Sequence, residues 1–339
     1  MKRTLLVVSA LLMIGIAVAV GWIVTDVNRP YKGYDGAEQF VEIPPGSSPA
    51  AMGRRLSDAG VVRNEAVFRL AVWMRGAGRR LQAGEYRFDA PISAAEVVDR
   101  IRRGDVYLQP ITFREGLTIR QMAQLYESRG FGPAAEFTAA ARNGRRVAAL
   151  DSQAPDLEGY LFPDTYTLPR RTTAAQLVER MVGAFERVIT EDLRAQAAAR
   201  GLNVRQLVTL ASLVEKETGK PEERPLVSAV YHNRLKINMA LYCDPTVIYA
   251  LERAGRYTGD LTRDDLQFDS PYNTYRYPGL PPGPIAAPGR ASLEAAANPA
   301  EVPYLYFVSR NDGSHVFAET LDEHNRNVYE FQKKPFNKK

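Results

Sequence analysis

The sequence contains few of the residues that form disulfides and metal sites. Among its 339 residues there are one cysteine and three histidines. The single Cys243 excludes an intramolecular disulfide, so packing alone must stabilise the fold. Because no cluster of Cys, His and acidic residues has metal-ligand spacing, we expect no metal and no cofactor. A glycine-rich phosphate loop and nucleic-acid-binding motifs are also missing, so we expect no nucleic-acid partner.

The charge balance is only mildly basic. The chain has 44 Lys and Arg against 39 Asp and Glu, a formal net charge of +5. This excess suits an anionic surface or polymer, but ordinary solvated helix faces explain it equally well.

One long hydrophobic run lies at the N-terminus. Residues 4–24 carry no charge, and the run is long enough to cross a bilayer as a helix. Lys2 and Arg3 precede it, so the positive-inside rule keeps the N-terminus in the cytoplasm. A cleaved signal peptide is the alternative, although the run is long and no small-x-small site closes it. We expect residues 1–25 to be a cytoplasmic tip and single-pass anchor in the cytoplasmic (inner) membrane, with the rest in the periplasm or outside.

Two segments of similar plan follow a polar linker at residues 26–39. Each predicts a strand, a turn at glycine, then an amphipathic helix ended by glycine. The matching positions, at identical spacings, are Val41, Ile43, Gly46, Met52 and Gly60, and then Ile111, Phe113, Gly116, Met122 and Gly130. The sequence therefore indicates an internal duplication, or a β-α-α-β plan used twice. The first segment, residues 40–106, resembles a LysM glycan-binding module.

Residues 207–218, LVTLASLVEKET, are the most informative about chemistry. Asn203 and Gln206 form a capping box that begins an apolar helix. On a helical wheel, Glu215 and Glu217 lie on opposite edges of the apolar stripe.

The two glutamates have different neighbours on that wheel. Glu217 lies beside branched aliphatic residues, whereas Glu215 lies beside smaller and more polar ones. We therefore expect desolvation to raise the pKa of Glu217 more than that of Glu215. A carboxyl group with a raised pKa is typical of a general acid. The alternative is a pair of exposed glutamates in a last helical turn, one of them paired with a lysine or arginine.

A long loop at residues 267–290 adds candidates for binding. Tyr272 and Tyr275 could stack on sugar rings, while Asn273 and Thr274 could donate hydrogen bonds; a tyrosine-packed surface loop is the alternative. The three histidines, His232, His315 and His324, are expected to be surface or capping residues. Cys243 has no base partner nearby in the sequence. Asp244 is expected to be a helix N-cap.

Seven motifs together resemble the MltG (YceG-like) family of endolytic murein transglycosylases. They occur in order over about residues 40–333: LEGYLFPDTY, LASLVEKET, HNRL, DPTVIYAL, SPYNTY, GLPPGPIAAPG and PYLYFV. The resemblance implies that Glu217, which is followed directly by Thr, is the catalytic residue. Asn233 and Asp244 lie in matched motifs and are further candidates for substrate binding. The thiol of Cys243 departs from the motif pattern.

The resemblance also implies a fold and an activity. The expected fold is α+β: an N-terminal transmembrane helix, a LysM-like α/β subdomain at 40–106 and an α+β catalytic domain at 107–339. The expected reaction cleaves the β-1,4 bond between N-acetylmuramic acid (MurNAc) and N-acetylglucosamine (GlcNAc) inside glycan strands, leaving 1,6-anhydro ends and terminating strand elongation. Peptidoglycan glycan is the expected partner, with peptidoglycan synthases as further partners. The alternatives are a hydrolytic muramidase and a non-enzymatic peptidoglycan-binding anchor.

Overall fold

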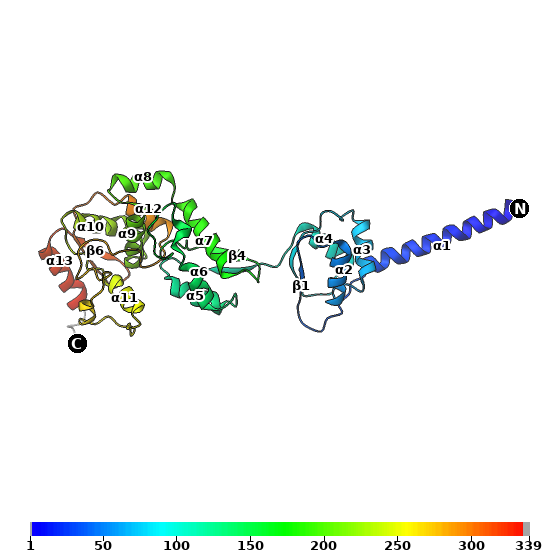
Figure 1. Cartoon of the computed structure of the whole chain (residues 1–339), viewed down its shortest axis with the longest axis horizontal. Helices are drawn as coiled ribbons and strands as arrows, with labels where there is room; N and C mark the ends of the chain where they lie inside the picture. The colour runs from blue at the N-terminus through cyan, green and yellow to red at the C-terminus, as the bar shows by residue number, and fades with distance from the viewer. Residues whose placement is uncertain (1, 335–339) are drawn as a thin grey trace. The chain divides into compact units, whose positions relative to one another are not determined.

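The structure is a computed structural model that describes residues 2–334. Within them, helices are combined with three two-stranded sheets (Figure 1). The expected α+β class is therefore confirmed. The chain divides into two compact units: the first runs to Pro110 and includes Thr167–Arg171, and the second comprises Ile111–Tyr166 and the chain from Thr172 onwards.

Helix α1 (Lys2–Asn28) contains the N-terminal apolar run. Its length and composition suit a membrane span, and a signal sequence meets the same criteria. The helix continues three residues beyond the expected end of the anchor at residue 25. Its last turn packs on the first unit, because Val27 is buried and Asp26 pairs with Arg63 at 2.5 Å. The start of the expected 26–39 linker is thus helical.

The first unit is a small α/β structure. Strand β1 (Gln39–Ile43) pairs antiparallel with β2 (Gly84–Phe88), and Val41 lies opposite Tyr86. Both side chains are buried in a hydrophobic core, since alternate residues of a strand point to one face. Three amphipathic helices complete this core: α2 (Pro49–Asp58), α3 (Glu65–Met74) and α4 (Ala94–Arg103).

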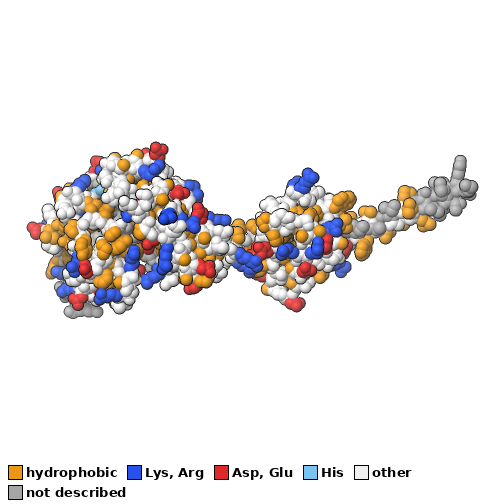
Figure 2. All heavy atoms as spheres, viewed as in Figure 1, with side chains coloured by type: hydrophobic (Ala, Val, Ile, Leu, Met, Phe, Trp, Pro, Cys, Tyr) orange, Lys and Arg blue, Asp and Glu red, His pale blue; other side chains and the backbone are white. Residues whose placement is uncertain are grey.

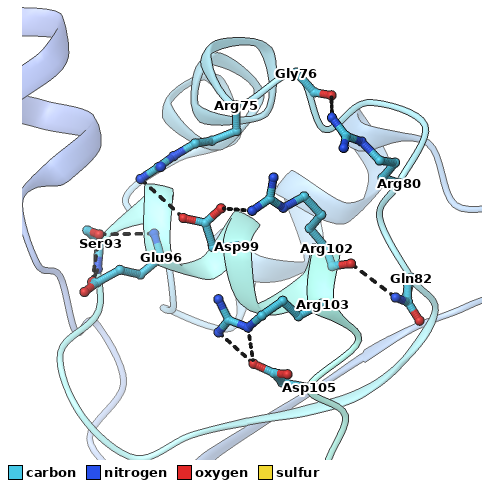
Figure 3. Close-up of polar contacts among 10 residues, drawn as sticks. All are labelled: Arg75, Gly76, Arg80, Gln82, Ser93, Glu96, Asp99, Arg102, Arg103 and Asp105. Atoms are coloured by element: carbon cyan, nitrogen blue, oxygen red, sulfur yellow. Dashed lines mark hydrogen bonds and ion pairs between the residues drawn. The ribbon is translucent and has the colours of Figure 1, made fainter.

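Polar contacts fix both ends of α4 (Figure 3). Ser93 and Glu96 form a capping box, which satisfies N–H groups of the first turn. Asp99 lies between the guanidinium groups of Arg75 and Arg102, at 3.3 Å from each. Gly104 then ends the helix in the left-handed conformation, with φ of 72°.

The same order of elements occurs a second time. Strand β3 (Gln109–Thr112), helices α5 (Ile119–Ser128) and α6 (Ala134–Ala141), strand β4 (Thr165–Leu168) and helix α7 (Ala174–Val188) follow one another. Gly46 and Gly116, which occupy matching positions, both have φ of 76°. The repeated β-α-α-β plan is confirmed.

The remaining helices surround α9 (Val204–Glu217), which contacts α8 (Glu191–Ala199), α10 (Arg224–Lys236), α11 (Asp244–Arg253) and α12 (Arg290–Ala297). Figure 1 shows α9 in the interior between α10 and α12. A hairpin of β5 (Tyr306–Ser309) and β6 (His315–Ala318) and helix α13 (Leu321–Val328) end the unit. Single turns complete it: Gly144–Val147, Pro221–Glu223, Asp265–Gln267 and Tyr329–Lys333. Acidic and basic side chains are interspersed on the face drawn in Figure 2.

Candidate active site

Helix α9 brings two carboxylates to the edge of a buried core. Asn203 and Gln206 form the expected capping box at its start. Every residue from Leu207 to Val214 is buried. Because the helix ends at Glu217, both glutamates lie in its last turn, where the core meets the surface.

Glu215 is a structural carboxylate. It forms an ion pair with Arg224 at 3.3 Å, and both side chains are less than a tenth exposed. It also accepts hydrogen bonds from the Gly289 amide at 3.0 Å and the Ser292 hydroxyl at 2.7 Å. These bonds join α9 to α10 and to the start of α12. The carboxylate therefore has no free oxygen with which to approach a substrate.

Glu217 has a different environment. Tyr231 on α10 donates its hydroxyl to Glu217 Oε1 at 2.7 Å, and the thiol of Cys243 also hydrogen-bonds the carboxyl group. Burial raises the pKa of Glu217, and the two hydrogen bonds oppose this rise. The wheel placed branched aliphatic side chains around Glu217. The wheel considers α9 alone, and α10 and the start of α11 add the phenol and the thiol.

Glu217 opens onto a cavity of about 410 Å³ with aromatic walls. The Arg234 guanidinium lies against the rings of Tyr242 and Tyr306, at 5.8 and 5.5 Å from their centres. Aromatic faces and planar donors suit sugar rings and their hydroxyl groups. The lining residues are Glu217, Arg234, Tyr242, Asp244, Tyr275, Tyr306, Phe307, Leu321 and His324.

Asp244 is a second carboxylate in this cavity. The sequence predicted a helix N-cap, but Cys243 is the N-cap, and Asp244 is the first residue of α11. Since Asp244 is already helical, its side chain is free to accept the Tyr275 hydroxyl and to line the cavity with Glu217. Glu217 and Asp244 are therefore two acids of one cavity.

Two other residues of the tyrosine-rich loop are buried. The Asn273 side chain donates to the carbonyls of Leu266 and Phe268 at 3.0 and 2.8 Å. Thr274 Oγ1 accepts the Cys243 amide at 3.0 Å, which ties the loop to α11. Both side chains are almost fully inaccessible to solvent. Asn273 and Thr274 therefore hold the loop in place. Of the three consecutive residues Asn273, Thr274 and Tyr275, only Tyr275 lines the cavity.

The last two predicted binding residues lie elsewhere. The Asn233 amide donates to two backbone carbonyls within residues 302–304 and so holds the segment that leads to β5. The ring of Tyr272 lies 5.1 Å from that of Tyr249, at the far end of α11 from Asp244. The structure thus brings Tyr275 and Asp244 together with Glu217, and leaves Asn233 and Tyr272 outside the cavity lining.

The histidines are dispersed. His232 donates to a backbone carbonyl of α12 at 2.9 Å, and burial lowers its pKa. His315 pairs with Glu223 at 2.7 Å. His324 stacks on a tyrosine ring at the edge of the cavity. In the part of the chain that the structure describes, no three His, Cys, Asp or Glu residues are grouped as metal ligands.

Sequence reasoning missed Tyr231, Arg234 and Cys243. All three lie in or beside the HNRL and DPTVIYAL motifs, which were the available signal. A helical wheel shows only one helix, and these contacts depend on how α10 and α11 pack on α9. Burial, opposed by the hydrogen bonds of Tyr231 and Cys243, keeps Glu217 protonated to a pH above its usual range, next to an aromatic cavity. Such an acid can protonate a glycosidic oxygen.

Comparison with known proteins identifies one family and relatives with the same name. The sequence model of the YceG-like family matches residues 41–330. An endolytic murein transglycosylase of Bacillus subtilis strain 168 is 33% identical over 301 residues, which cover 84% of this chain and 82% of that protein. Another of Streptococcus pneumoniae strain D39 is 30% identical over 86% of this chain, which spans 58% of that longer protein.

A solved structure is also similar. The crystal structure of a yceG-like protein from Listeria monocytogenes has a TM-score of 0.58 and 32% identity, and covers 86% of this chain and 98% of its own. The family match spans both units and every residue of the candidate site. The chain belongs to the YceG-like family.

Proposed function

We propose that the chain is an endolytic lytic transglycosylase of peptidoglycan, with Glu217 as its catalytic acid and base. The observation that carries this proposal is Glu217 itself. It is a carboxyl group of raised pKa, held by Tyr231 and Cys243, at the edge of an aromatic cavity of about 410 Å³. The names of the relatives supply the substrate class.

In the proposed reaction, Glu217 protonates the oxygen between MurNAc and GlcNAc as that bond breaks. The resulting carboxylate then takes the proton from the muramoyl 6-hydroxyl, which attacks C1 and closes a 1,6-anhydro ring. The attacking hydroxyl is tethered to the reacting sugar, which favours it over water. The rings of Tyr242 and Tyr275, 5.2 Å apart at the cavity wall, would contact the sugars. Cuts of this kind within new strands would terminate their elongation.

A hydrolytic muramidase is the second candidate, and Asp244 favours it. A hydrolase needs a second carboxylate to activate water or to act as nucleophile. Asp244 lines the same cavity as Glu217, but its carboxylate accepts the Tyr275 hydroxyl. We propose that Asp244 positions Tyr275. In that role it does not act as the base that would activate a water molecule.

Mass spectrometry of digested glycan strands tests the choice. We expect internal cuts whose ends are 1,6-anhydro-MurNAc, one water lighter than hydrolysed ends. In Asp244→Asn the anhydro fraction of the products should stay unchanged, because no water needs activation. Reducing MurNAc ends that disappear with Asp244→Asn would establish the muramidase instead.

The N-terminal helix and the first unit would place this activity beside new peptidoglycan. We propose that α1 is a single-pass anchor of the inner membrane with the second unit outside, motivated by Lys2 and Arg3 before the apolar run. The first unit would bind glycan as a LysM-like module, and synthases of the glycan would be partners. A reporter active only in the cytoplasm, fused after Lys339, should be silent. Strong reporter activity would reverse the proposed orientation.

A further inference from the structure

The second unit contains another cavity, of about 400 Å³, that the proposed reaction does not use. It lies among the start of α5, the helix α6 and the end of α11. Its walls carry both charges and small apolar groups, which suits a zwitterionic or acidic ligand. The lining residues are Thr118, Ile119, Arg120, Thr138, Ala141, Arg142, Asp156, Glu158, Tyr249, Glu252 and Arg253.

Two buried side chains line the inner part of this cavity. Glu158 accepts the Ile119 amide at 3.0 Å and the Tyr249 hydroxyl at 3.2 Å. Burial raises the pKa of Glu158 to about 8, so this carboxyl group is largely neutral at pH 7. A neutral carboxyl does not repel an anionic ligand.

The outer part carries three exposed arginines. Arg120 is neutralised by Glu252 at 3.4 Å. Arg142 and Arg253 have no ion-pair partner among residues 2–334, and Arg253 instead donates to the Tyr249 hydroxyl at 3.3 Å. Asp156, on the same cavity wall, interacts electrostatically with Arg253 without forming an ion pair. Two guanidinium groups outside any ion pair favour a ligand that carries carboxylates.

Helix α11 connects this cavity to the candidate active site. Asp244 in its first turn lines the active-site cavity, and Arg253, nine residues along, lines the second one. Nine helical steps of 1.5 Å span about 13.5 Å. The loop runs beside the helix over this distance, since Tyr275 bonds Asp244 and Tyr272 lies against Tyr249.

We propose that the cavity at the end of α11 binds the acidic peptide that a muramic acid carries on its lactyl group. About four extended residues span this distance at roughly 3.3 Å each, so the peptide of a sugar held at Glu217 is long enough to reach Arg253, and Arg142 lines the same cavity. Neutral sugars would form no ion pairs with two guanidinium groups. The peptide has free carboxylates, which can form them. This inference rests on the proposed function, because it takes the sugar at Glu217 to be muramic acid.

The test compares two substrates: glycan strands with their peptides, and the same strands stripped of peptides by an amidase. The enzymes are the full-length wild type, Arg142→Glu, and Arg145→Glu as matched control. Arg145 is an exposed arginine three residues away that does not line the cavity. We expect wild-type kcat/KM to be about tenfold higher on peptide-bearing strands, since one charge-assisted bond contributes about 1.5 kcal/mol. This ratio should fall near one in Arg142→Glu and stay near ten in Arg145→Glu.

Any other pattern of these ratios overturns the proposal. An unchanged ratio in Arg142→Glu excludes peptide binding here, and an equal loss on both substrates assigns the cavity to the glycan itself. If the wild type produces no anhydro ends from either substrate, the proposed function fails instead. Binding then separates the two failures: the tetrapeptide released by the amidase should bind Glu217→Gln protein, and about tenfold more weakly when Arg142→Glu is added. If the tetrapeptide does not bind, the proposed peptide site is wrong, and the proposed transglycosylase function is unaffected.

Discussion

Glu217→Gln should lower the rate of glycan cleavage by roughly 10²- to 10⁴-fold, the usual contribution of general acid–base catalysis. Glutamine keeps the shape of the side chain and can still accept the Tyr231 hydroxyl, but it has no proton to give. The measurement is the release of anhydro-ended fragments from purified strands. Glu222→Gln, a change at an exposed glutamate just after α9, is the matched control and should keep the wild-type rate.

The pH dependence separates catalysis from folding. The pKa of Glu217 is raised above the free value of 4.5, so the neutral form stabilises the fold below about that pH. This stability is lost as the pH rises through the folded-state pKa, because a charge must then be buried. Glu217→Gln avoids that loss, so its stability relative to wild type should increase with pH above 4.5. An inactive variant that is also less stable at high pH would point to a structural role for Glu217.

Glu215→Ala should act on stability. It leaves the Arg224 guanidinium, which is 8% exposed, without its buried partner, and removes the acceptor of the Gly289 amide and the Ser292 hydroxyl. Breaking a buried ion pair costs about 3–5 kcal/mol, and we expect a loss of unfolding free energy in this range. Urea unfolding measures it, with Glu222→Ala expected to change stability by less than about 0.5 kcal/mol.

The two glutamates thus make a paired test. A Glu215→Ala protein that folds with wild-type stability but has lost activity would exchange the roles we give to Glu215 and Glu217. Loss of stability with activity preserved in the folded fraction supports the assignment. We expect one variant to lose activity and the other to lose stability, because Glu217 faces the cavity whereas Glu215, two residues before it, is held in a buried ion pair.

Local signals predicted the elements well. The capping box at Asn203 begins a helix as predicted, because a short polar side chain followed three residues later by Gln satisfies the first amides of a helix within a few residues of the chain. The β5–β6 hairpin turns at Asn311 and Gly313, both in the left-handed conformation. These features depend on residues that are close in sequence.

The site required contacts between distant residues. Tyr231 and Cys243 are 14 and 26 positions after Glu217 in the sequence, and neither the wheel nor the spacing shows that they contact it. The error on Asp244 had a smaller cause: the helix begins one residue earlier than the Asp-Pro pair suggested, which frees the carboxylate for Tyr275. One residue of helix boundary therefore decides whether the Asp244 side chain caps α11 or accepts the Tyr275 hydroxyl.

The buried hydrogen bonds of Asn273 and Thr274 have a thermodynamic consequence for binding. They hold the backbone that leads into Tyr275 before any ligand arrives. Ordering a loop or a side chain on association costs conformational entropy, and a surface already rigid in the free protein avoids that cost. The tyrosine face should therefore be preorganised. The affinity for sugar would then be set by the contacts between sugar and tyrosines, because binding would cost little conformational entropy in the loop.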